Sequence, residues 1–306
     1  MKIISILSIC ILFFACNDKK EVLKEPINNP TQQAFQLPDL PVKMYFGGKV
    51  IYLEDQDIRE RLDREVLTNV YLQSATSQII KRAHRWFPVI EKILKQENVP
   101  DDFKYLAVIE SALVEQAISP VGAQGFWQFM PFTAKEYHLE ISPEVDERLD
   151  VEKSTQAACK YLKQANLQFN DWLLAAASYN RGIGGVTTDL HWQKAKSYFD
   201  MEQNQETGRY VYRILALKII LENQLAYGFS IPDSQKYPVI KTKKHVITST
   251  IQNLSDWAIN KGYNYKILKK LNPWILKTHL TIKNKKYTLL LPDNKEKLRP
   301  YAYYQQ

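Results

Sequence analysis

The sequence predicts a mainly α-helical protein with a small mixed α and β module near its C-terminus. Three observations support this prediction. Apolar residues recur at helical spacings of three and four over most of residues 55–228. The pattern then changes at Ile231-Pro232-Asp233 and Tyr237-Pro238, which are typical of a linker. After it, two short helical patterns lie between two runs of strand-forming residues, in the order strand, helix, helix, strand.

The composition is that of an ordinary globular protein. The chain has 306 residues, of which 45% are hydrophobic and 24% are charged. Its formal net charge of +8 suits an anionic surface or substrate. However, Lys and Arg are spread along the chain without a dense basic run or a nucleic-acid-binding motif. We therefore expect no nucleic-acid partner.

The first 15 residues are predicted to be an export signal. Lys2 precedes an apolar stretch, residues 3–15, that has the length of a secretory signal and is too short to span a bilayer. The stretch ends in Phe13-Phe14-Ala15-Cys16, which resembles a bacterial lipoprotein signal, and polar residues follow at once. We therefore expect cleavage before Cys16 and acylation of its thiol, which would hold the protein at a membrane. An ordinary signal peptide with an incidental cysteine is the alternative.

The remaining cysteines and the histidines predict neither a disulfide nor a metal site. Removal of Cys10 and acylation of Cys16 would leave Cys159 as a free thiol. Cys159 follows two alanines in an amphipathic stretch, where a small buried hydrophobe is expected rather than a nucleophile. No paired ligand spacing links the five histidines, so we expect no metal and no cofactor. They are His84, His138, His191, His245 and His279.

Changes in composition and the positions of helix- and strand-breaking residues divide the chain into seven predicted segments. They are a lipoprotein signal peptide (1–15), a proline-containing tether (16–50), an N-terminal helical segment (51–100), the main helical domain (101–229), a linker (230–243), the α+β module (244–292) and a tail (293–306). An interruption or kink is expected at Trp86-Phe87-Pro88. Helix starts are predicted at Asp101, at Thr133 with Glu136 in capping-box spacing, and at Asp150.

Glu110 is the candidate for acid–base chemistry. It shares one helical stripe with apolar residues, namely Phe103, Leu106, Ala107, Leu113 and Val114. Burial disfavours an ionised carboxylate and raises its pKa, which is what a general acid needs near neutral pH. The alternative is a structural glutamate that pairs with an arginine or caps a buried backbone group.

Two further stretches have the residue types of a sugar-binding cleft. A turn-rich loop, residues 119–125, leads into Phe126-Trp127-Gln128-Phe129-Met130-Pro131. A cleft that binds sugars needs aromatic side chains along its walls and a few fixed polar groups. Trp127 and Gln128 are residues of these two types. The alternative is that the rings and Met130 belong to the core and that Gln128 lies in solvent.

The second stretch is Ser178-Tyr179-Asn180 followed by three glycines, where backbone can approach a ligand closely. Tyr179 offers a hydroxyl for a carboxyl or acetamido group, and Asn180 could brace the loop. A helix C-cap with a demanding turn is the alternative.

These motifs together carry a resemblance to a known family. Glu110-Ser111, the run 122–131 and Ser178-Tyr179-Asn180 resemble the three motifs of soluble-lytic-transglycosylase-type domains, nearest to the membrane-bound lytic murein transglycosylase D family. The similarity covers about residues 101–228. It continues through Asp146-Glu147-Arg148 with Asp150, Lys153-Ser154-Thr155, and Glu206-Thr207 with Tyr210-Val211. Arg181 and Ile183 stand where the family usually has Ala and Pro.

The resemblance implies a lysozyme-like α-helical domain, similar to goose-type lysozyme, that cleaves the β-1,4 bond between N-acetylmuramic acid and N-acetylglucosamine. Glu110 would protonate the leaving oxygen and then take the proton of the muramyl C6 hydroxyl, which closes a 1,6-anhydro ring. Because the substrate's N-acetyl group assists, no second acid is required. The residues expected to bind or orient the substrate are Ser111, Ser119, Trp127, Gln128, Tyr179 and Asn180.

The C-terminal module, from about residue 245 to 292, resembles a LysM repeat, which is a peptidoglycan-binding βααβ unit. The resemblance lies in Leu254-Ser255-Asp256-Trp257-Ala258 and in the run 268–274. The usual Gly-Asp-Thr turn is replaced by Ser249-Thr250-Ile251-Gln252-Asn253. Sugar binding and a purely structural role are the two alternatives for this module.

Three functions remain open at this point. They are a lytic transglycosylase, a hydrolytic muramidase and a non-catalytic lipoprotein that binds peptidoglycan. A muramidase would take a second carboxylate from Glu115, Asp146 or Glu147. The expected partners are peptidoglycan glycan strands and, through Cys16, a membrane. The expected location is the cell envelope, with a lipid anchor in the outer membrane facing the periplasm.

Overall fold

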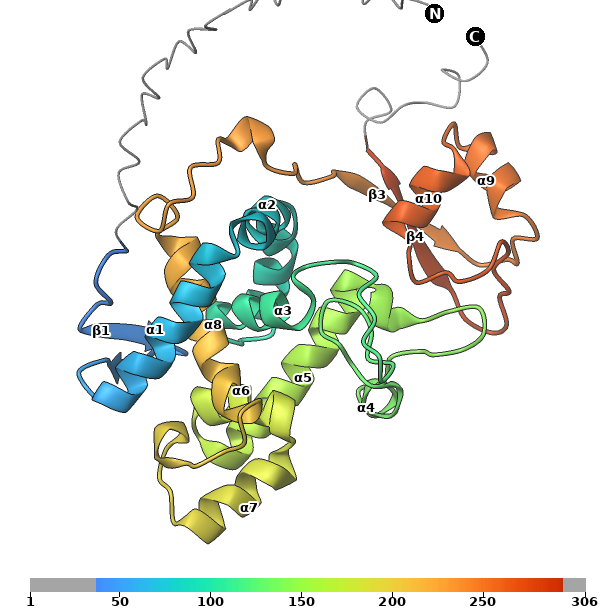
Figure 1. The fold of residues 1–306 in the computed structure, drawn as a ribbon. Coiled ribbons are helices and arrows are strands. Elements are labelled where there is room, and N and C mark those ends of the chain that lie inside the picture. Colours follow the sequence, from blue (N-terminus) through green and yellow to red (C-terminus); the bar gives the residue numbers. More distant parts are fainter. Residues whose placement is uncertain (1–36, 294–306) are drawn as a thin grey trace, which may run out of the picture. The chain divides into compact units, whose positions relative to one another are not determined.

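The computed structural model describes residues 37–293 (Figure 1). The predicted signal peptide, Cys16, most of the predicted tether and nearly all of the predicted tail lie outside the described residues. The helices of the main domain are α1 Gln56–Tyr71, α2 Gln73–Gln96, α3 Lys104–Ser111, α4 Pro131–Glu136, α5 Val151–Phe169, α6 Trp172–Arg181, α7 Ile183–Gln193 and α8 Thr207–Glu222. Short 3₁₀ turns lie at Asp101–Phe103, Glu147–Leu149, Tyr198–Asp200 and Asp233–Gln235. The prediction of a mainly α-helical body is confirmed.

Helix α8 is the central helix of the main domain. It packs against α1, α3 and α6, and it is visible between them in orange in Figure 1. Its sequence, TGRYVYRILALKIILE, is apolar around most of its circumference, and most of its side chains are buried. A helix that is apolar on nearly all sides is stable only where neighbours cover every face. Polar side chains such as Arg209 and Tyr210 therefore face other helices, and they contribute to the site described below.

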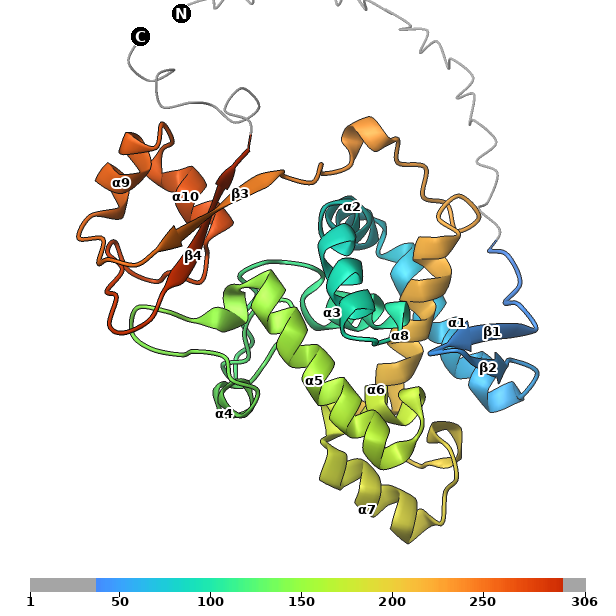
Figure 2. The ribbon, with the colours of Figure 1, turned by 180° about the vertical axis from the view of Figure 1, so that it is seen from behind.

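A β-hairpin precedes the first helix (Figure 2). Strands β1 Lys43–Phe46 and β2 Lys49–Tyr52 pair antiparallel around Gly47-Gly48, which have φ of +57° and +80°. A two-residue turn with both φ values positive favours glycine at each position. The predicted tether, which was drawn to residue 50, is thus structured over its last residues. The sequence feature that indicates this hairpin is the Gly-Gly pair between two short apolar runs.

Helix α2 runs continuously through Trp86-Phe87-Pro88, so the interruption that was one of the two alternatives predicted there is absent. Proline lacks the N–H that would bond to the carbonyl of the residue four positions earlier, His84. Both Pro88 and His84 are exposed. Water can therefore satisfy that carbonyl, and the apolar face of α2 keeps the helix in place from its other side.

The predicted helix starts have mixed outcomes. Asp150 caps α5 as expected, because its carboxylate accepts from the backbone N–H of Lys153 at 3.0 Å. Helix α4 begins at Pro131 rather than at Thr133, and Met130 is its N-cap. Proline is favoured at the first helical position, where its missing N–H has no helical partner to lose. Asp101 opens a 3₁₀ turn instead of capping a helix.

The C-terminal module has the predicted order of strand, helix, helix and strand. It consists of β3 Thr242–Ile247, α9 Leu254–Asn260, α10 Tyr265–Leu271 and β4 Tyr287–Pro292, with β3 and β4 antiparallel. Its core contains Leu254, Leu268 and Leu289. Asn253 caps α9 through bonds from the N–H groups of Ser255 and Asp256. The segment that replaces the usual turn thus ends in a helix cap.

Across residues 37–293, no helix combines the length and the apolar character needed to cross a membrane. Cys159 is a buried free thiol in α5, as expected, and burial raises its pKa to about 12. A thiol that is protonated at neutral pH is a poor nucleophile.

Candidate active site

Glu110 lies in the last turn of α3, where the chain turns sharply. Ala112 and Leu113 both have left-handed backbone conformations, with φ of 50° and 57°. Such conformations are costly for residues with a side chain and persist only where neighbours enforce them. Here the Arg82 side chain donates to the Ala112 carbonyl at 2.7 Å, and the Leu113 N–H donates to the Ser111 hydroxyl at 3.2 Å. The end of the helix that bears Glu110 is therefore fixed from both sides.

The Glu110 carboxyl is partly buried and touches one hydroxyl group. The Tyr210 hydroxyl, from α8, donates a short hydrogen bond to its Oε1 atom. The pKa of Glu110 is raised to about 7, mainly by burial and in smaller part by the nearby Glu206 charge. The Tyr210 hydrogen bond and the Arg213 charge act in the opposite direction. Because burial is the largest of these effects, the carboxyl holds its proton up to neutral pH.

Two α8 residues and the N-cap of that helix act on Glu110, and they lie on one face. Glu206, Tyr210 and Arg213 have the spacing i, i+4, i+7, so they form a stripe along α8. Glu206, just before the first residue of the helix, is exposed, and Arg213 is partly exposed. A carboxylate and a guanidinium group thus flank the phenol that contacts the candidate acid.

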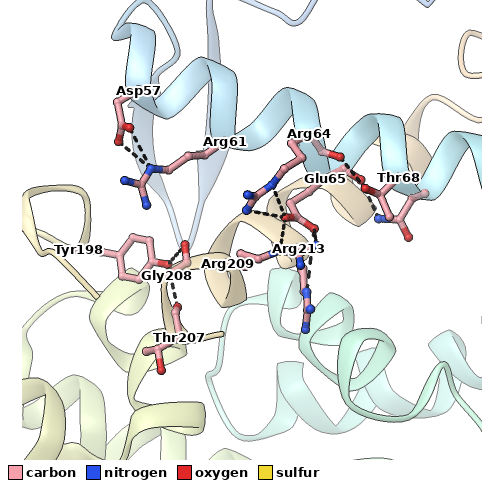
Figure 3. A network of polar contacts seen from close by, with 11 residues as sticks. Asp57, Arg61, Arg64, Glu65, Thr68, Tyr198, Thr207, Gly208, Arg209 and Arg213 are labelled. Carbon is pink, nitrogen blue, oxygen red and sulfur yellow. Dashed lines mark hydrogen bonds and ion pairs between the residues drawn. The ribbon is translucent and has the colours of Figure 1, made fainter. Parts of the chain in front are cut away.

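A buried ion-pair network holds this part of α8 (Figure 3). Glu65, from α1, is 1% exposed. Its two carboxylate oxygens accept from the Nε and Nη2 atoms of Arg209 at 2.7 and 3.0 Å. Arg64 and Arg213 lie 3.2 and 3.9 Å from the same carboxylate. Since Arg209 directly precedes Tyr210, this network fixes the phenol in relation to Glu110.

The turn-rich loop is held by its own polar groups. The Gln128 amide nitrogen donates to the carbonyls of Ala117 and Gly125, at 3.1 and 2.8 Å. The Ser119 hydroxyl accepts from the Ala123 N–H at 3.0 Å. These bonds explain how Gln128 keeps a positive φ of 46°. The loop therefore presents Ser119 and Gln128 in a defined arrangement.

Trp127 lies in the core and links the loop to two helices. Its ring is 0% exposed, and its Nε1 atom donates to the Thr155 hydroxyl at 2.9 Å. Its carbonyl accepts from the Tyr179 hydroxyl at 2.9 Å. Burial, followed by the Glu110 charge, raises the pKa of Tyr179 well above its ordinary value. The third predicted motif thus meets the second motif close to Glu110.

Ser111 completes this connection. Its hydroxyl lies 3.0 Å from the carbonyl oxygens of Ala107 and Phe126. The three motifs, far apart in sequence, are therefore brought together around Glu110.

Some predicted ligands are placed differently from the expectation. The core alternative holds for the buried rings of Phe126, Trp127 and Phe129, so Trp127 is not a surface wall for a sugar. Met130 is 42% exposed, so the part of that alternative that placed Met130 in the core is wrong. The buried Ser111 hydroxyl is engaged with backbone groups rather than facing solvent.

The remaining candidates lie at the surface or next to it. Ser119, Gln128 and Tyr179 are partly exposed, and Asn180 is exposed near the end of α6. Arg181, which replaces the usual alanine, pairs with Asp189 at 3.0 Å. The substrate-binding roles of the predicted residues remain predictions.

Two of the three carboxylates considered for a second acid, Asp146 and Glu147, have ion-pair partners. Asp146 pairs with Arg148 at 2.6 Å, and Glu147 pairs with Lys153. The third is Glu115, whose pKa is raised by burial and lowered by the charges of Arg85 and Lys270. Sequence reasoning did not select Tyr210 or Glu206 as functional, although both belong to the family pattern. Within residues 37–293, no cluster of His, Cys, Asp and Glu could hold a metal ion.

Two segments of the chain match known protein families. Residues 87–201 match the family described as transglycosylase SLT domain, and residues 243–295 match the soluble lytic transglycosylase C-terminal LysM-like domain. Membrane-bound lytic murein transglycosylase D of Escherichia coli (strain K12) is 30% identical over 251 residues, which are 80% of this chain and 54% of that protein. The chain thus spans about half the length of this relative.

Two further similarities are more limited. A putative tributyltin chloride resistance protein of Alteromonas sp. (strain M-1) is 34% identical over 121 residues, which are 39% of this chain and 58% of that protein. The crystal structure of the 70 kDa soluble lytic transglycosylase of Escherichia coli has 25% sequence identity and a TM-score of 0.40, and the match covers 49% of this chain and 26% of that one. The chain therefore carries a transglycosylase SLT domain of lysozyme-like fold followed by a LysM-like domain, and it is a homologue of membrane-bound lytic murein transglycosylase D.

Proposed function

We propose that this protein is a peptidoglycan lytic transglycosylase that cleaves the β-1,4 bond between N-acetylmuramic acid and N-acetylglucosamine, with Glu110 as acid and base. The observation that carries the proposal is the state of the Glu110 carboxyl. Burial raises its pKa to about 7. A group with this pKa can both donate and accept a proton near neutral pH, as a two-step reaction on one residue requires.

The reaction uses this one group twice. Glu110 first gives its proton to the glycosidic oxygen that leaves with N-acetylglucosamine, while the acetamido oxygen of the muramyl sugar bonds to the anomeric carbon. Ionised Glu110 then takes the proton of the muramyl C6 hydroxyl, whose oxygen displaces the acetamido group and closes a 1,6-anhydro ring. Glu110 regains its proton, and no water enters the product. Such substrate assistance is a recognised exception to glycosidases with two carboxylates.

The surroundings of Glu110 suit these two steps. Tyr210 donates to Oε1, which leaves Oε2 to face the glycosidic oxygen. When Glu110 is ionised, the same hydroxyl and the Arg213 charge stabilise the negative charge. The ionised state is thus reachable without a metal ion or a second acid.

The segment after Glu110 offers a surface for the sugars. Several apolar side chains on it are exposed, namely Val114, Ile118, Val121 and Met130. The apolar faces of sugar rings pack on such side chains, and polar groups fix their orientation. The amide nitrogen of Gln128 is engaged with two carbonyls, so its amide oxygen is the atom we assign to a sugar hydroxyl or acetamido N–H. Ser119, Tyr179 and Asn180 are the other polar groups that we assign to substrate binding.

Digestion of purified peptidoglycan tests the proposal. The native protein should release fragments that end in 1,6-anhydromuramic acid, identified by mass spectrometry because each is one water lighter than the hydrolysis product. Glu110→Gln should lower the rate by about 10²- to 10⁴-fold, since it removes the acid and base. Glu136→Gln is the matched control, because Glu136 is an exposed glutamate at the end of α4.

Two outcomes would reject the proposal. A Glu110→Gln variant that cleaves at the native rate would remove Glu110 from the chemistry. A folded native protein that binds peptidoglycan without cleaving it would favour a non-catalytic binding protein.

A hydrolytic muramidase is the second candidate, and Glu206 is the observation that favours it. This exposed carboxylate is close enough to raise the pKa of Glu110. A muramidase would use it to activate water, or as a nucleophile. Products heavier by one water that disappear in Glu206→Gln would identify this reaction, whereas anhydro products that persist in Glu206→Gln would reject it.

We also propose that the mature protein is anchored in the cell envelope through lipid on Cys16, at the outer membrane facing the periplasm. The lipoprotein-like end of the signal and the membrane-bound relative support this proposal. Cells fed radiolabelled palmitate should label the native protein but not Cys16→Ala. Equal labelling of both proteins would place the lipid elsewhere.

A further inference from the structure

The C-terminal module makes its backbone contacts with the main domain through residues 140–149, between α4 and α5. An ion pair between Lys244 and Glu152, in α5, adds to them. The Asp146 N–H donates to the Trp274 carbonyl at 2.9 Å, and the Leu276 N–H donates to the Glu144 carbonyl at 2.8 Å. Val145 and Ile275 form an isolated β-bridge between these two bonds. The segment therefore lies against the module as a short extra strand.

Side chains extend this contact. The Glu144 carboxylate accepts from the N–H and the hydroxyl of Thr281, at 2.9 and 3.0 Å. The Tyr287 hydroxyl donates to the Glu140 carboxylate, 2.9 Å away. Val145 and Leu149 are buried in the hydrophobic core of the module itself. The module thus uses residues of the main domain to complete its own core.

The same segment holds the loop that carries Gln128. Arg148 is 5% exposed and is paired with Asp146, which is 4% exposed. Its Nη1 atom donates to the carbonyls of Gly122 and Phe129, at 2.8 and 3.0 Å. Its Nη2 atom donates to the Gln124 side-chain oxygen at 2.5 Å. One guanidinium group therefore ties together both ends of the loop 122–129.

The loop in turn contacts the neighbours of Glu110. The Phe126 carbonyl lies at hydrogen-bond distance from the Ser111 hydroxyl, and the Trp127 carbonyl accepts from Tyr179. A continuous series of bonds thus runs from Trp274 through Asp146 and Arg148 to the residues beside Glu110.

We infer that Arg148 is a positioning residue for glycan cleavage, and that the C-terminal module supports catalysis through it rather than only by binding the cell wall. This inference rests on the proposed function. Arg148 acts through the loop and does not itself touch the sugar. A misplacement of about 1 Å in substrate-positioning groups can lower a rate about 100-fold, so a loop tied at both ends has a direct effect on turnover.

Arg148→Lys tests the first half of the inference. Lysine keeps the charge beside Asp146 but cannot reach two carbonyls and an amide oxygen at once. On solubilised, uncrosslinked glycan strands we expect kcat to fall about 10- to 100-fold. The pH at which the rate falls should be the same as in the native protein, because this variant leaves unchanged the charged and titratable groups that face Glu110. These groups are Glu206, Tyr210, Arg213 and Tyr179. Arg61→Lys, in an exposed pair with Asp57, is the control and should keep the native rate.

If Arg148→Lys fails to fold, Gln124→Met replaces it. This variant removes one acceptor of Arg148 and leaves the buried pair with Asp146 intact. It should lower kcat about 3- to 10-fold, which corresponds to one lost charge-assisted hydrogen bond.

A double-mutant cycle tests the second half of the inference. Thr281→Val with Tyr287→Phe removes the two hydroxyl bonds from the module to Glu144 and Glu140, and leaves the Lys285 ion pair with Glu140 in place. In the native background this change should lower kcat several-fold on soluble strands, and in the Arg148→Lys background it should have no further effect. Lys243→Met, which removes a module ion pair to Asp293, is the control and should change neither rate.

The outcomes separate the two proposals. If the native protein forms no anhydro products, the proposed function fails. If the native protein is active but Arg148→Lys or Gln124→Met turns over at the native rate, Arg148 does not position the loop. If the module variants lower the rate by the same factor in both backgrounds, the module does not act through Arg148.

Discussion

Two glutamates contact neighbouring residues of α8, and they differ in burial and in their direct partners. Glu65 is almost completely buried and lies among three arginines, Arg64, Arg209 and Arg213. Glu110 is less buried, and its direct partner is the neutral hydroxyl of Tyr210. Burial alone therefore does not decide what a carboxyl does. A buried carboxylate in direct contact with several cations forms a structural ion pair. Where no cation touches the carboxyl directly, burial outweighs the hydrogen bond from a phenol, and the group can act as an acid.

The largest expected effect is on stability and concerns Glu65. Glu65→Gln removes the charge that accepts two hydrogen bonds from the partly exposed Arg209, so the free energy of unfolding should fall by about 3 kcal/mol. Denaturant unfolding measures it. Asp57→Asn, in an exposed pair with Arg61, should cost less than about 1 kcal/mol. Equal losses in the two variants would remove the distinction between the buried network and the surface pair.

Glu110→Gln should have the opposite effect on stability, and the effect should depend on pH. The Glu110 pKa is about 7 in the folded protein against an ordinary 4.5, so its ionised form destabilises the fold. The free energy of unfolding of the native protein should fall by up to about 3 kcal/mol as pH rises from about 4.5 to about 7, because of this group. It should then level off. Urea unfolding at pH 5, 7 and 9 should show that Glu110→Gln lacks this contribution. Parallel stability curves for the two proteins would contradict it.

Tyr210→Phe should move the pH dependence of cleavage. The Tyr210 hydroxyl stabilises ionised Glu110, so its loss should raise the Glu110 pKa and shift the fall in kcat/KM to higher pH by about one unit. A close control exists in the same pair of helices. Tyr105, in α3, donates to Glu222, in α8, at 3.1 Å. Tyr105→Phe should leave the pH profile unchanged, and a similar shift in both variants would show that the phenol at 210 has no special relation to Glu110.

The smallest expected effects come from the two charges on the same α8 face. Glu206 raises the Glu110 pKa and Arg213 lowers it. The pH profile of kcat/KM should therefore shift to lower pH in Glu206→Gln and to higher pH in Arg213→Met, each by a few tenths of a unit. Because these side chains are at least partly exposed, 1 M salt should shrink both shifts. Shifts of the same sign would show that the variants act through structure rather than through charge.

Much of the fold follows from local sequence patterns. Helical spacing predicted that Glu110 shares a face with Leu106 and Ala107, which are buried in α3. Strand and helix signals predicted the order of the C-terminal module. The hairpin at 43–52 was missed because each strand has only four residues and lies in a proline-containing region. The continuity of α2 through Pro88 depends on which face of the helix is exposed, which a single proline does not reveal.

The site was less accessible from sequence because its contacts are long-range. Tyr210 contacts a residue 100 positions earlier, and Arg148 holds a loop about 20 positions before it. The sequence shows that a tyrosine is present at position 210, but it does not show that α3 packs against α8, and this packing brings Tyr210 to Glu110. Likewise, an aromatic residue beside Gln128 suits a sugar wall and a core equally well. The Trp127 ring lies in the core, where its polar Nε1 atom is satisfied because it donates to the Thr155 hydroxyl.

Gly125 sets a practical limit on redesign of this protein. A Cβ atom at this position would lie 1.9 Å from the Arg148 carbonyl oxygen, and its φ is +80°. Any other amino acid would push the loop away from the segment that supports it. Libraries intended to change sugar preference should therefore keep position 125 fixed. They should diversify exposed positions such as Ile118 and Val121, where new side chains find open solvent.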